Sequence, residues 1–428
     1  MRILGITVIA TVLSVAGCSG GAPSQDDLRG QTVEVVGTWS GDEQARFDQV
    51  AEKFEEKTGV EVKYTPAGDE LPTVLETRLQ GGTAPNVALV AQPGLVARFA
   101  ADGKLKPVAS SVATAVEANY AGVWKQLGSF NGQLYGVYFK SANKSTVWYS
   151  DAAFALAGVG VPKTWEEFLA VAGTISETGT AGVSVAGADG WTLTDWFENV
   201  YLRTAGPENY DKLSRHEIPW TDPTVRVALQ ALAQLFGAPQ LVEGGSAGAL
   251  QTEFAKSVTN VFGSQRNAAM VFEGDFVSGV ISANTSANLG TEAKFFPFPS
   301  VAGSKDAVVA GGDMAVQFKD DAATTAFMEY LASAEAAEVW AGIGGFLSPN
   351  KNVSAAVYPD DVTRELAQQL VKAGDNVRFD MSDLAPAAFG GTKGAGEWKA
   401  LQDFLANPAS IDATMQRLEA EAVKAFTA

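Results

Sequence analysis

The order of secondary structure near the start of the chain is the feature that most limits its fold. Residues 32–36 form a β-branched run typical of a strand, and residues 60–64 alternate apolar and polar side chains as a second strand does. Between them, Phe47, Val50 and Phe54 recur at helical spacing, which indicates an amphipathic helix. A strand, a crossover helix and another strand form the unit of a parallel sheet, so the segment predicts an α/β fold.

The same alternation continues along the rest of the chain. Further strands are predicted at 87–90, 134–139, 146–149 and 268–272, and strand material broken by Gly311-Gly312 at 308–318. Helices are predicted at 72–79 and 326–340, with more helix within 401–426. Ser40 with Glu43 and Thr164 with Glu167 have capping-box spacing, which predicts two helix starts. The pattern favours two α/β lobes.

The charge and the rare residues exclude several classes of function. The chain has 428 residues, with 49 acids against 31 Lys and Arg and a formal net charge of −18, which disfavours nucleic-acid binding. It contains one His and one Cys, so the usual zinc sites and an internal disulfide are not expected. Asp320-Asp321 and Asp360-Asp361 lack calcium-loop spacing and are interpreted as helix N-terminal charges. His216 is expected at the surface without a role, and neither a metal nor a cofactor is expected.

The first residues have the pattern of an export signal. Met1 and Arg2 precede an apolar run from Ile3 to Val15, which is too short to span a bilayer comfortably. The following Val15-Ala16-Gly17-Cys18 resembles the lipobox of bacterial lipoproteins. This resemblance implies a signal peptide at 1–17 that is removed, lipidation of Cys18 and a flexible tether at 18–30. An ordinary signal peptide with an incidental Cys is the alternative. The protein is expected to be extracytoplasmic, with the lipid holding it on the outer face of the cell membrane.

Several stretches of the chain resemble one family. Residues 158–168 read Gly-Val-Gly-Val-Pro-Lys-Thr-Trp-Glu-Glu-Phe, and residues 267–270 read Asn-Ala-Ala-Met. Together with Phe-Pro-Phe-Pro at 296–299 and Gly-Gly-Phe-Leu-Ser-Pro at 344–349, they resemble, in order, the bacterial family 1 extracellular solute-binding proteins. Residues 37–41 and 378–383 are most similar to the alpha-glucoside-binding branch of that family.

The resemblance implies a periplasmic-binding-protein fold, in which two α/β lobes are joined by a hinge of three crossing segments. The crossings are expected near 138–142, 299–308 and 349–354. The expected lobes are 31–139 with 304–350, and 140–303 with 351–428. Such a protein closes around its ligand as a monomer and presents it to the permease subunits of an ABC transporter.

Residues expected to bind a ligand come from the same resemblance and from sugar chemistry. A neutral carbohydrate is held by carboxylates and amides on its hydroxyls and by aromatic rings on its C–H face. The expected residues are Ser40, Gly41, Asp42, Glu43, Gln92, Asn143, Trp191, Asp195, Glu273, Asp275, Phe276, Gly312, Asp313, Arg378, Asp380 and Asp383.

Some of these residues have alternative interpretations. Ser40 can instead be a helix cap, and Gln92 can be a surface loop residue. Arg378 and Asp380 can instead form an ordinary salt bridge with each other. Lys140 and Lys144 fit solvated charges. Trp196 is assigned to the core. Phe276 stands where relatives often have Trp, which leaves sugar selectivity open.

The leading hypothesis is a transport receptor that captures an alpha-glucoside or a related oligosaccharide and leaves it unchanged. A second hypothesis is a surface glycoside hydrolase, which needs two carboxylates about 5–10 Å apart. A third is a receptor for another solute such as a glycerophosphodiester, for which Lys140, Lys144 and Arg378 would supply positive charge.

Overall fold

The computed structural model describes residues 28–305, 307–373 and 377–427. The predicted signal peptide, the predicted lipidation site at Cys18 and most of the predicted tether lie outside these residues. Leu28 is already buried, and Gly30 donates a backbone hydrogen bond to Gly59. Residues 28–30 therefore belong to the folded body, although they were expected in the tether.

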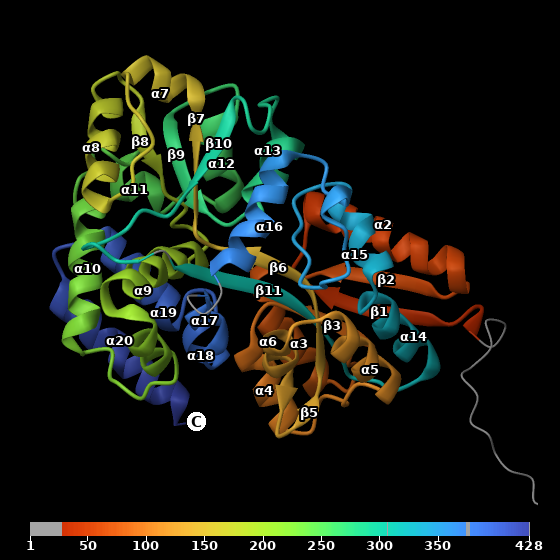
Figure 1. Cartoon of the computed structure of the whole chain (residues 1–428). Helices are drawn as coiled ribbons and strands as arrows, with labels where there is room; N and C mark the ends of the chain where they lie inside the picture. The colour runs from red at the N-terminus through yellow and green to blue at the C-terminus, as the bar shows by residue number, and fades with distance from the viewer. Residues whose placement is uncertain (1–27, 306, 374–376, 428) are drawn as a thin grey trace, which may run out of the picture.

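A mixed sheet forms the centre of the first lobe (Figure 1). Its strand order is β12-β11-β3-β1-β2, and β6 also pairs with β11. The strands are β1 Thr32–Gly37, β2 Glu61–Pro66, β3 Val87–Val90, β6 Gly136–Asn143, β11 Val308–Gln317 and β12 Val377–Phe379. β1 runs parallel to β2 and β3, which confirms the strand–helix–strand prediction, whereas β11 runs antiparallel to β3 and β6.

Helices cover the first sheet. They are α2 Gly41–Thr58, α3 Leu71–Gln80, α4 Pro93–Ala101, α5 Ser110–Asn119, α6 Gly122–Leu127, α14 Ala322–Leu331 and α15 Ala334–Ala341. A 3₁₀ turn, η1 Gly68–Glu70, follows β2, and β4 Ser129–Phe130 pairs with β5 Gln133–Leu134. Phe47, Val50 and Phe54 are buried along one face of α2, as their spacing predicted.

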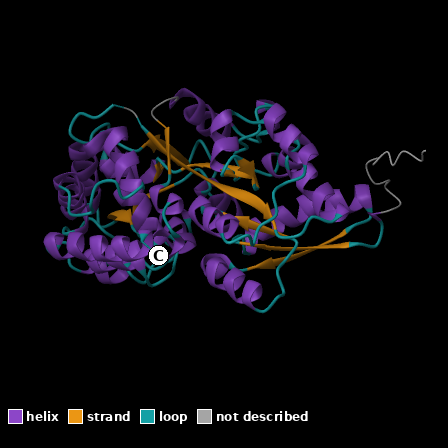
Figure 2. Ribbon diagram, turned by 90° about the horizontal axis from the view of Figure 1, so that it is seen from below, coloured by secondary structure: helices purple, strands orange, loops and turns teal. Residues whose placement is uncertain are grey.

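The second lobe has a sheet of its own, in the order β10-β7-β9-β8. Its strands are β7 Thr146–Ser150, β8 Ala181–Ser184, β9 Ala268–Glu273 and β10 Ala293–Pro297. The helices are α7 Asp151–Ala157, α8 Trp165–Ser176, α9 Trp191–Ser214, α10 Pro223–Phe236, α11 Gly245–Ala249, α12 Phe254–Phe262, α13 Val277–Asn284, α17 Met381–Leu384, α18 Ala387–Gly390, α19 Gly396–Ala406 and α20 Ile411–Phe426. Figure 2 shows helices packed beside the strands in both lobes, with some strands of the molecule at the lower right edge of the view.

Three crossings join the lobes. The chain passes from β6 to β7, from β10 to β11, and finally from β12 to α17. The third crossing lies later than expected, because Asn350 bridges to Tyr120 in the first lobe and β12 still pairs with β11. Helix α16 Asp361–Ala373 precedes β12 and packs against β6 and β11. The segment 377–379 thus extends the first sheet, although the sequence placed it in the second lobe.

Two element predictions were wrong for identifiable reasons. Gly311-Gly312 does not break β11. Glycine is needed at both positions, because a Cβ at Gly311 would lie 2.8 Å from the Lys144 side chain, and a Cβ at Gly312 would lie 2.6 Å from the Lys140 carbonyl oxygen. The predicted helix 326–340 is two helices, because the Ser333 side chain accepts from the Ala336 N–H and caps the start of α15.

The two predicted capping boxes have different outcomes. Thr164 and Glu167 form one at the start of α8. Ser40 precedes α2, but its side chain makes no capping hydrogen bond. The Glu43 carboxylate accepts a hydrogen bond from the Lys140 ammonium instead of the Ser40 backbone. His216 is also less exposed than expected, because its side chain, 15% exposed, contacts Glu419.

Candidate functional site

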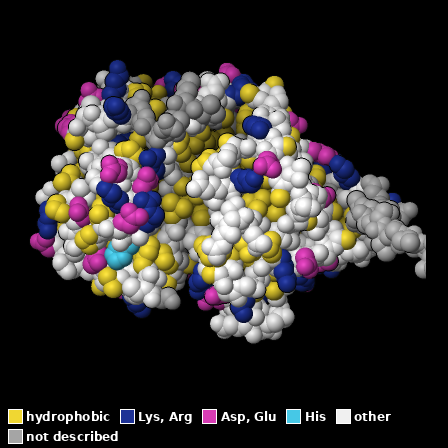
Figure 3. All heavy atoms as spheres, turned by 60° about the horizontal axis from the view of Figure 1, so that its bottom comes forward, with side chains coloured by type: hydrophobic (Ala, Val, Ile, Leu, Met, Phe, Trp, Pro, Cys, Tyr) yellow, Lys and Arg dark blue, Asp and Glu magenta, His cyan; other side chains and the backbone are white. Residues whose placement is uncertain are grey.

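A cavity of about 210 Å³ is lined by both lobes. Figure 3 shows the hollow between the lobes, with hydrophobic side chains along it. Its lining comprises Thr38, Trp39, Glu43, Gly68, Asp69, Leu71, Pro72, Ala91, Gln92, Lys140, Ala142, Lys144, Trp191, Phe254, Phe276, Gly312, Asp313, Ser382, Asp383 and Trp398. Most of these residues follow the carboxyl end of a strand or begin a helix, where ligands of open α/β sheets bind.

The first lobe contributes a polar wall to the cavity. Lys140 on β6 lies beside Asp313 on the neighbouring β11, and its Nζ is 2.5 Å from Oε1 of Glu43. The indole Nε1 of Trp39 donates to Oδ2 of Asp313 at 3.2 Å. Burial raises the pKa of Asp313, and Lys140 opposes that shift. Lys140 is 4% exposed, so it compensates internal carboxylates, and the alternative interpretation as a solvated charge does not hold.

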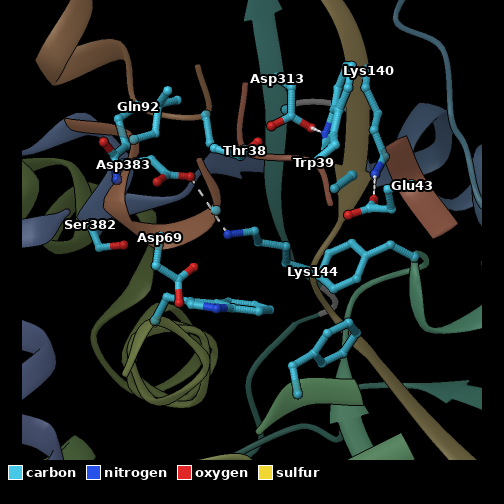
Figure 4. Close-up of a pocket in the computed structure, with 18 of the residues that line it drawn as sticks. Thr38, Trp39, Glu43, Asp69, Gln92, Lys140, Lys144, Asp313, Ser382 and Asp383 are labelled. Atoms are coloured by element: carbon cyan, nitrogen blue, oxygen red, sulfur yellow. Dashed lines mark hydrogen bonds and ion pairs between the residues drawn. The ribbon is translucent and has the colours of Figure 1, made fainter. Parts of the chain in front are cut away.

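Lys144 occupies the crossing between β6 and β7 and points into the cavity (Figure 4). Its Nζ lies 2.5 Å from Asp380, 3.3 Å from Asp195 and 3.7 Å from Asp383. Burial alone would lower the pKa of Lys144, but these carboxylates outweigh burial and hold it well above its usual value. Burial likewise favours a higher pKa for Asp380, yet Lys144 brings it down to about 2. The ammonium therefore neutralises buried acids, and it too is not a solvated charge.

Aromatic side chains of the second lobe form the opposite wall. The ring centroids of Trp191, Phe254 and Phe276 lie 5.4 to 6.0 Å apart, with their planes tilted by 59 to 73°. Trp191 begins α9, Phe254 begins α12 and Phe276 precedes α13, while Trp398 lies in the first turn of α19. The wall presents flat apolar surface that stacks on a ligand and excludes water.

Seven of the sixteen predicted ligand residues line the cavity. These are Glu43, Gln92, Trp191, Phe276, Gly312, Asp313 and Asp383. Five others lie buried outside the lining: Asn143, Asp195, Glu273, Asp275 and Asp380. The remaining four, Ser40, Gly41, Asp42 and Arg378, are not part of the lining either.

The buried set organises the junction between the lobes. The backbone N–H of Asn143 donates to Oδ1 of Asp275 at 2.6 Å, and its side chain donates to Gln369 of α16 at 3.3 Å. Burial raises the pKa of Asp275 and of Asp195 to about 7, and raises that of Glu273 well above its usual value. The two hydrogen bonds of Asn143 thus link the end of β6 to Asp275, which follows β9, and to α16.

Two of the residues outside the cavity have other partners. Arg378 forms a salt bridge with Asp211 at 2.7 Å, so its charged partner is on α9. Asp42 accepts a hydrogen bond from Asn284 of α13 at 3.0 Å, which joins the two lobes beside the cavity. Trp196 is buried in the second-lobe core, as its helical position suggested.

The sequence reasoning did not select several lining residues. Asp69 lies just beyond β2 on η1. Because ligands of open α/β sheets bind beyond the carboxyl ends of strands, its place after the predicted strand 60–64 was a signal that could have found it. Ser382 lies within the 378–383 stretch that carried the family resemblance. The sequence around Phe254 and Trp398 does not mark them as ligand residues, because an aromatic residue near a helix start fits a position in the hydrophobic core as well as it fits a ligand site.

The described ranges contain no group of three or more His, Cys, Asp or Glu side chains arranged to hold a metal ion. In the same residues, no helix combines the length and apolar character that crossing a bilayer requires. The side chains that line the cavity include hydrogen-bonding groups and aromatic rings.

Comparison with known proteins gives a consistent assignment. The profile of the bacterial extracellular solute-binding protein family matches residues 38–338. The osmoprotective compounds-binding protein GgtB of Synechocystis is 34% identical over 407 residues, covering 93% of this chain and 94% of that protein. The alpha-glucosides-binding periplasmic protein AglE of Rhizobium meliloti is 36% identical over 402 residues, covering 90% and 86%.

A solved structure supports the fold independently. The bacterial solute receptor AcbH superposes with a TM-score of 0.80 at 23% identity, covering 92% of this chain and 99% of that one. The two-lobe periplasmic-binding architecture expected from the sequence is confirmed.

Proposed function

The chain belongs to the bacterial extracellular solute-binding proteins, which capture solutes for ABC importers, and on that premise we propose that its ligand is an alpha-glucoside or a related small glycoside. The observation that carries the proposal is the cavity whose aromatic wall, with Trp191, Phe254 and Phe276, faces a polar wall with Glu43 and Asp313. A sugar ring has one apolar C–H face and an edge of hydroxyls, which match these two walls.

The charges of the cavity favour an uncharged ligand. Lys140 lies against Glu43 and Asp313, and Lys144 lies against three carboxylates that include Asp380. An anionic solute such as a glycerophosphodiester would have to compete with these internal carboxylates for both ammonium groups. That competition makes an anionic ligand the weaker candidate.

The proposed role leaves every bond of the ligand intact. A glycosidase requires an acid and a second carboxylate placed about 5–10 Å apart on either side of the scissile bond. Here Glu43 accepts a hydrogen bond from Lys140, and Asp313 accepts one from the indole of Trp39. The other two lining carboxylates, Asp383 and Asp69, lie 3.7 Å from Lys144 and 3.8 Å from Lys393, so all four have partners within the protein. The ligand is delivered to the permease subunits by a monomer.

A calorimetric screen tests the ligand class. We expect trehalose, sucrose or maltose to bind the purified protein, and glycerophosphocholine to bind at least about tenfold more weakly than the best sugar. Absence of binding by every alpha-glucoside would reject the class, and tighter binding of the phosphodiester would favour the anionic alternative. Shorter products after prolonged incubation with an oligosaccharide would show that the protein is an enzyme.

We also propose that Cys18 carries the lipid that holds the protein at the outer face of the cell membrane. The support is the lipobox-like Val15-Ala16-Gly17-Cys18 and the extracellular family of the chain. Cys18→Ala should move the protein from the membrane fraction to the soluble fraction and leave sugar affinity unchanged. A Cys18→Ala product that still carries lipid would contradict this proposal.

A further inference from the structure

Residues 391–395, the loop between α18 and α19, reach from the second lobe to the first at one end of the cavity. The Gly391 carbonyl accepts a hydrogen bond from Nε2 of Gln92 at 3.4 Å. A Cβ at Gly391 would lie 2.3 Å from that same nitrogen atom. The backbone of the 391–395 loop therefore rests directly against a cavity-lining side chain of the opposite lobe.

A charged contact reinforces this approach. Nζ of Lys393 lies 3.8 Å from Oδ2 of Asp69 on η1, which also lines the cavity. Asp189 and Glu253 of the second lobe are close enough to act on Asp69 electrostatically. Burial raises the pKa of Asp69 to about 6 and also raises the pKa of Asp189. The negative charge of Glu253 adds to both upward shifts, whereas the positive charge of Lys393 opposes both. Lys393 thus reduces the repulsion between carboxylates that face each other across the two lobes.

The two ends of the cavity are lined by different residues. In Figure 4, Gln92, Ser382, Asp383 and Asp69 lie toward one end, whereas Lys140 and Glu43 lie toward the other. The volume of the cavity is about 210 Å³, which is smaller than the about 300–1,000 Å³ typical of pockets for drug-sized ligands. A ligand enclosed here is short.

We propose that the 391–395 loop, through Gly391 on Gln92 and Lys393 on Asp69, closes one end of the cavity across the lobes and thereby sets the length of the bound ligand. This inference rests on the proposed function. Glycosides of one or two rings fit with the loop in place. A longer chain extends past Asp69 and Gln92 only by displacing the loop, so it loses these cross-lobe contacts.

The test compares oligosaccharide lengths in the full-length protein. Calorimetry with maltose, maltotriose and maltotetraose is carried out on the parent, Lys393→Ala, Lys393→Glu and Lys399→Ala. Lys399 is the matched control, because it lies on α19 and pairs with Asp403 of the same helix. The parent should bind maltotetraose at least about tenfold more weakly than maltose. Lys393→Ala should narrow the ratio of maltose to maltotetraose affinity by up to about fivefold, the upper end of the range for an exposed ion pair. Lys393→Glu should narrow the ratio further, because it places two carboxylates against each other.

Each outcome either supports or contradicts the proposed role of the 391–395 loop. A length preference that Lys393→Ala and Lys393→Glu relax, and Lys399→Ala preserves, supports the inference. If the parent binds all three sugars equally, the inference about the 391–395 loop is overturned and the proposed function remains. The same holds if the parent prefers maltose but neither Lys393 variant changes that preference. If no alpha-glucoside binds to the parent, the proposed function fails and the inference fails with it.

Discussion

The two walls of the cavity differ in chemistry and in how their side chains are held. The polar wall of the first lobe is crosslinked within itself, since Lys140, Glu43, Asp313 and Trp39 contact one another. The aromatic wall of the second lobe consists of rings at the starts of separate helices. If the ligand is the proposed glycoside, we expect the aromatic wall to supply most of the affinity through apolar burial, and the polar wall to select among hydroxyl patterns through preorganised groups.

The largest expected effect concerns the buried charges between the two walls. Lys144→Met should lower the free energy of unfolding by about 3–5 kcal/mol, because buried Asp195 and Asp380 would lose their compensating ammonium. Urea denaturation measures the change. Lys294→Met is the control, since that lysine pairs with Asp151 at the surface and its removal should cost less than about 1 kcal/mol. Equal losses in the two variants would contradict a structural role for Lys144.

Removing a ring from the aromatic wall should have the next largest effect. Trp191→Ala should weaken glucoside binding by about 1–3 kcal/mol, because stacking and burial on one face of the sugar are lost. Phe276→Ala should act in the same direction. Leu156→Ala is the control, because this α7 side chain is 74% exposed and does not line the cavity. Parent-like affinity in both ring variants would show that the second-lobe rings do not hold the ligand.

The junction behind the walls should make stability depend on pH. Burial raises the pKa of Asp275 to about 7, whereas an unfolded aspartate titrates near about 3.9. The folded protein therefore binds the extra proton between these values, and stability rises as the pH falls through 7. We expect the melting temperature to be about 2–5 °C higher at pH 5 than at pH 8.

Asp275→Asn separates this group from the other carboxyls. The amide oxygen still accepts from the Asn143 N–H, which donates to Oδ1 of Asp275 in the parent. The variant should therefore fold and lose part of the pH dependence. An unchanged pH profile in Asp275→Asn would assign the effect to other groups.

The smallest expected effect tests the selectivity of the polar wall. Glu43→Gln removes the charge that faces Lys140 but keeps an acceptor, so affinity for the best sugar should fall by only about 1 kcal/mol. The preference between glucosides and galactosides should change more than the affinity itself, which competition calorimetry measures. If the stereochemical preference is unchanged while affinity falls strongly, the polar wall contributes binding energy and no selectivity.

Several features of the fold were predictable because they are encoded locally. The apolar spacing in α2 and the alternation in β2 identified the first parallel unit. Of the residues expected to bind a ligand after β1, Glu43 lines the cavity, whereas Ser40, Gly41 and Asp42 do not. Gly311-Gly312 shows where local rules fail. A glycine pair normally weakens a strand, but here a neighbouring side chain and backbone approach too closely for a Cβ.

The sequence by itself determined the α/β class, the first parallel strands and the family, because periodicity and ordered motifs act over short stretches of chain. Only the tertiary structure decided which side chains meet. Lys144 contacts Asp380, and Lys393 lies by Asp69, across more than two hundred positions of sequence. Lys140 and Lys144, which fit solvated charges in the sequence, are counterions of carboxylates in the structure. Burial and pairing depend on how distant segments pack, and no local sequence pattern records that packing.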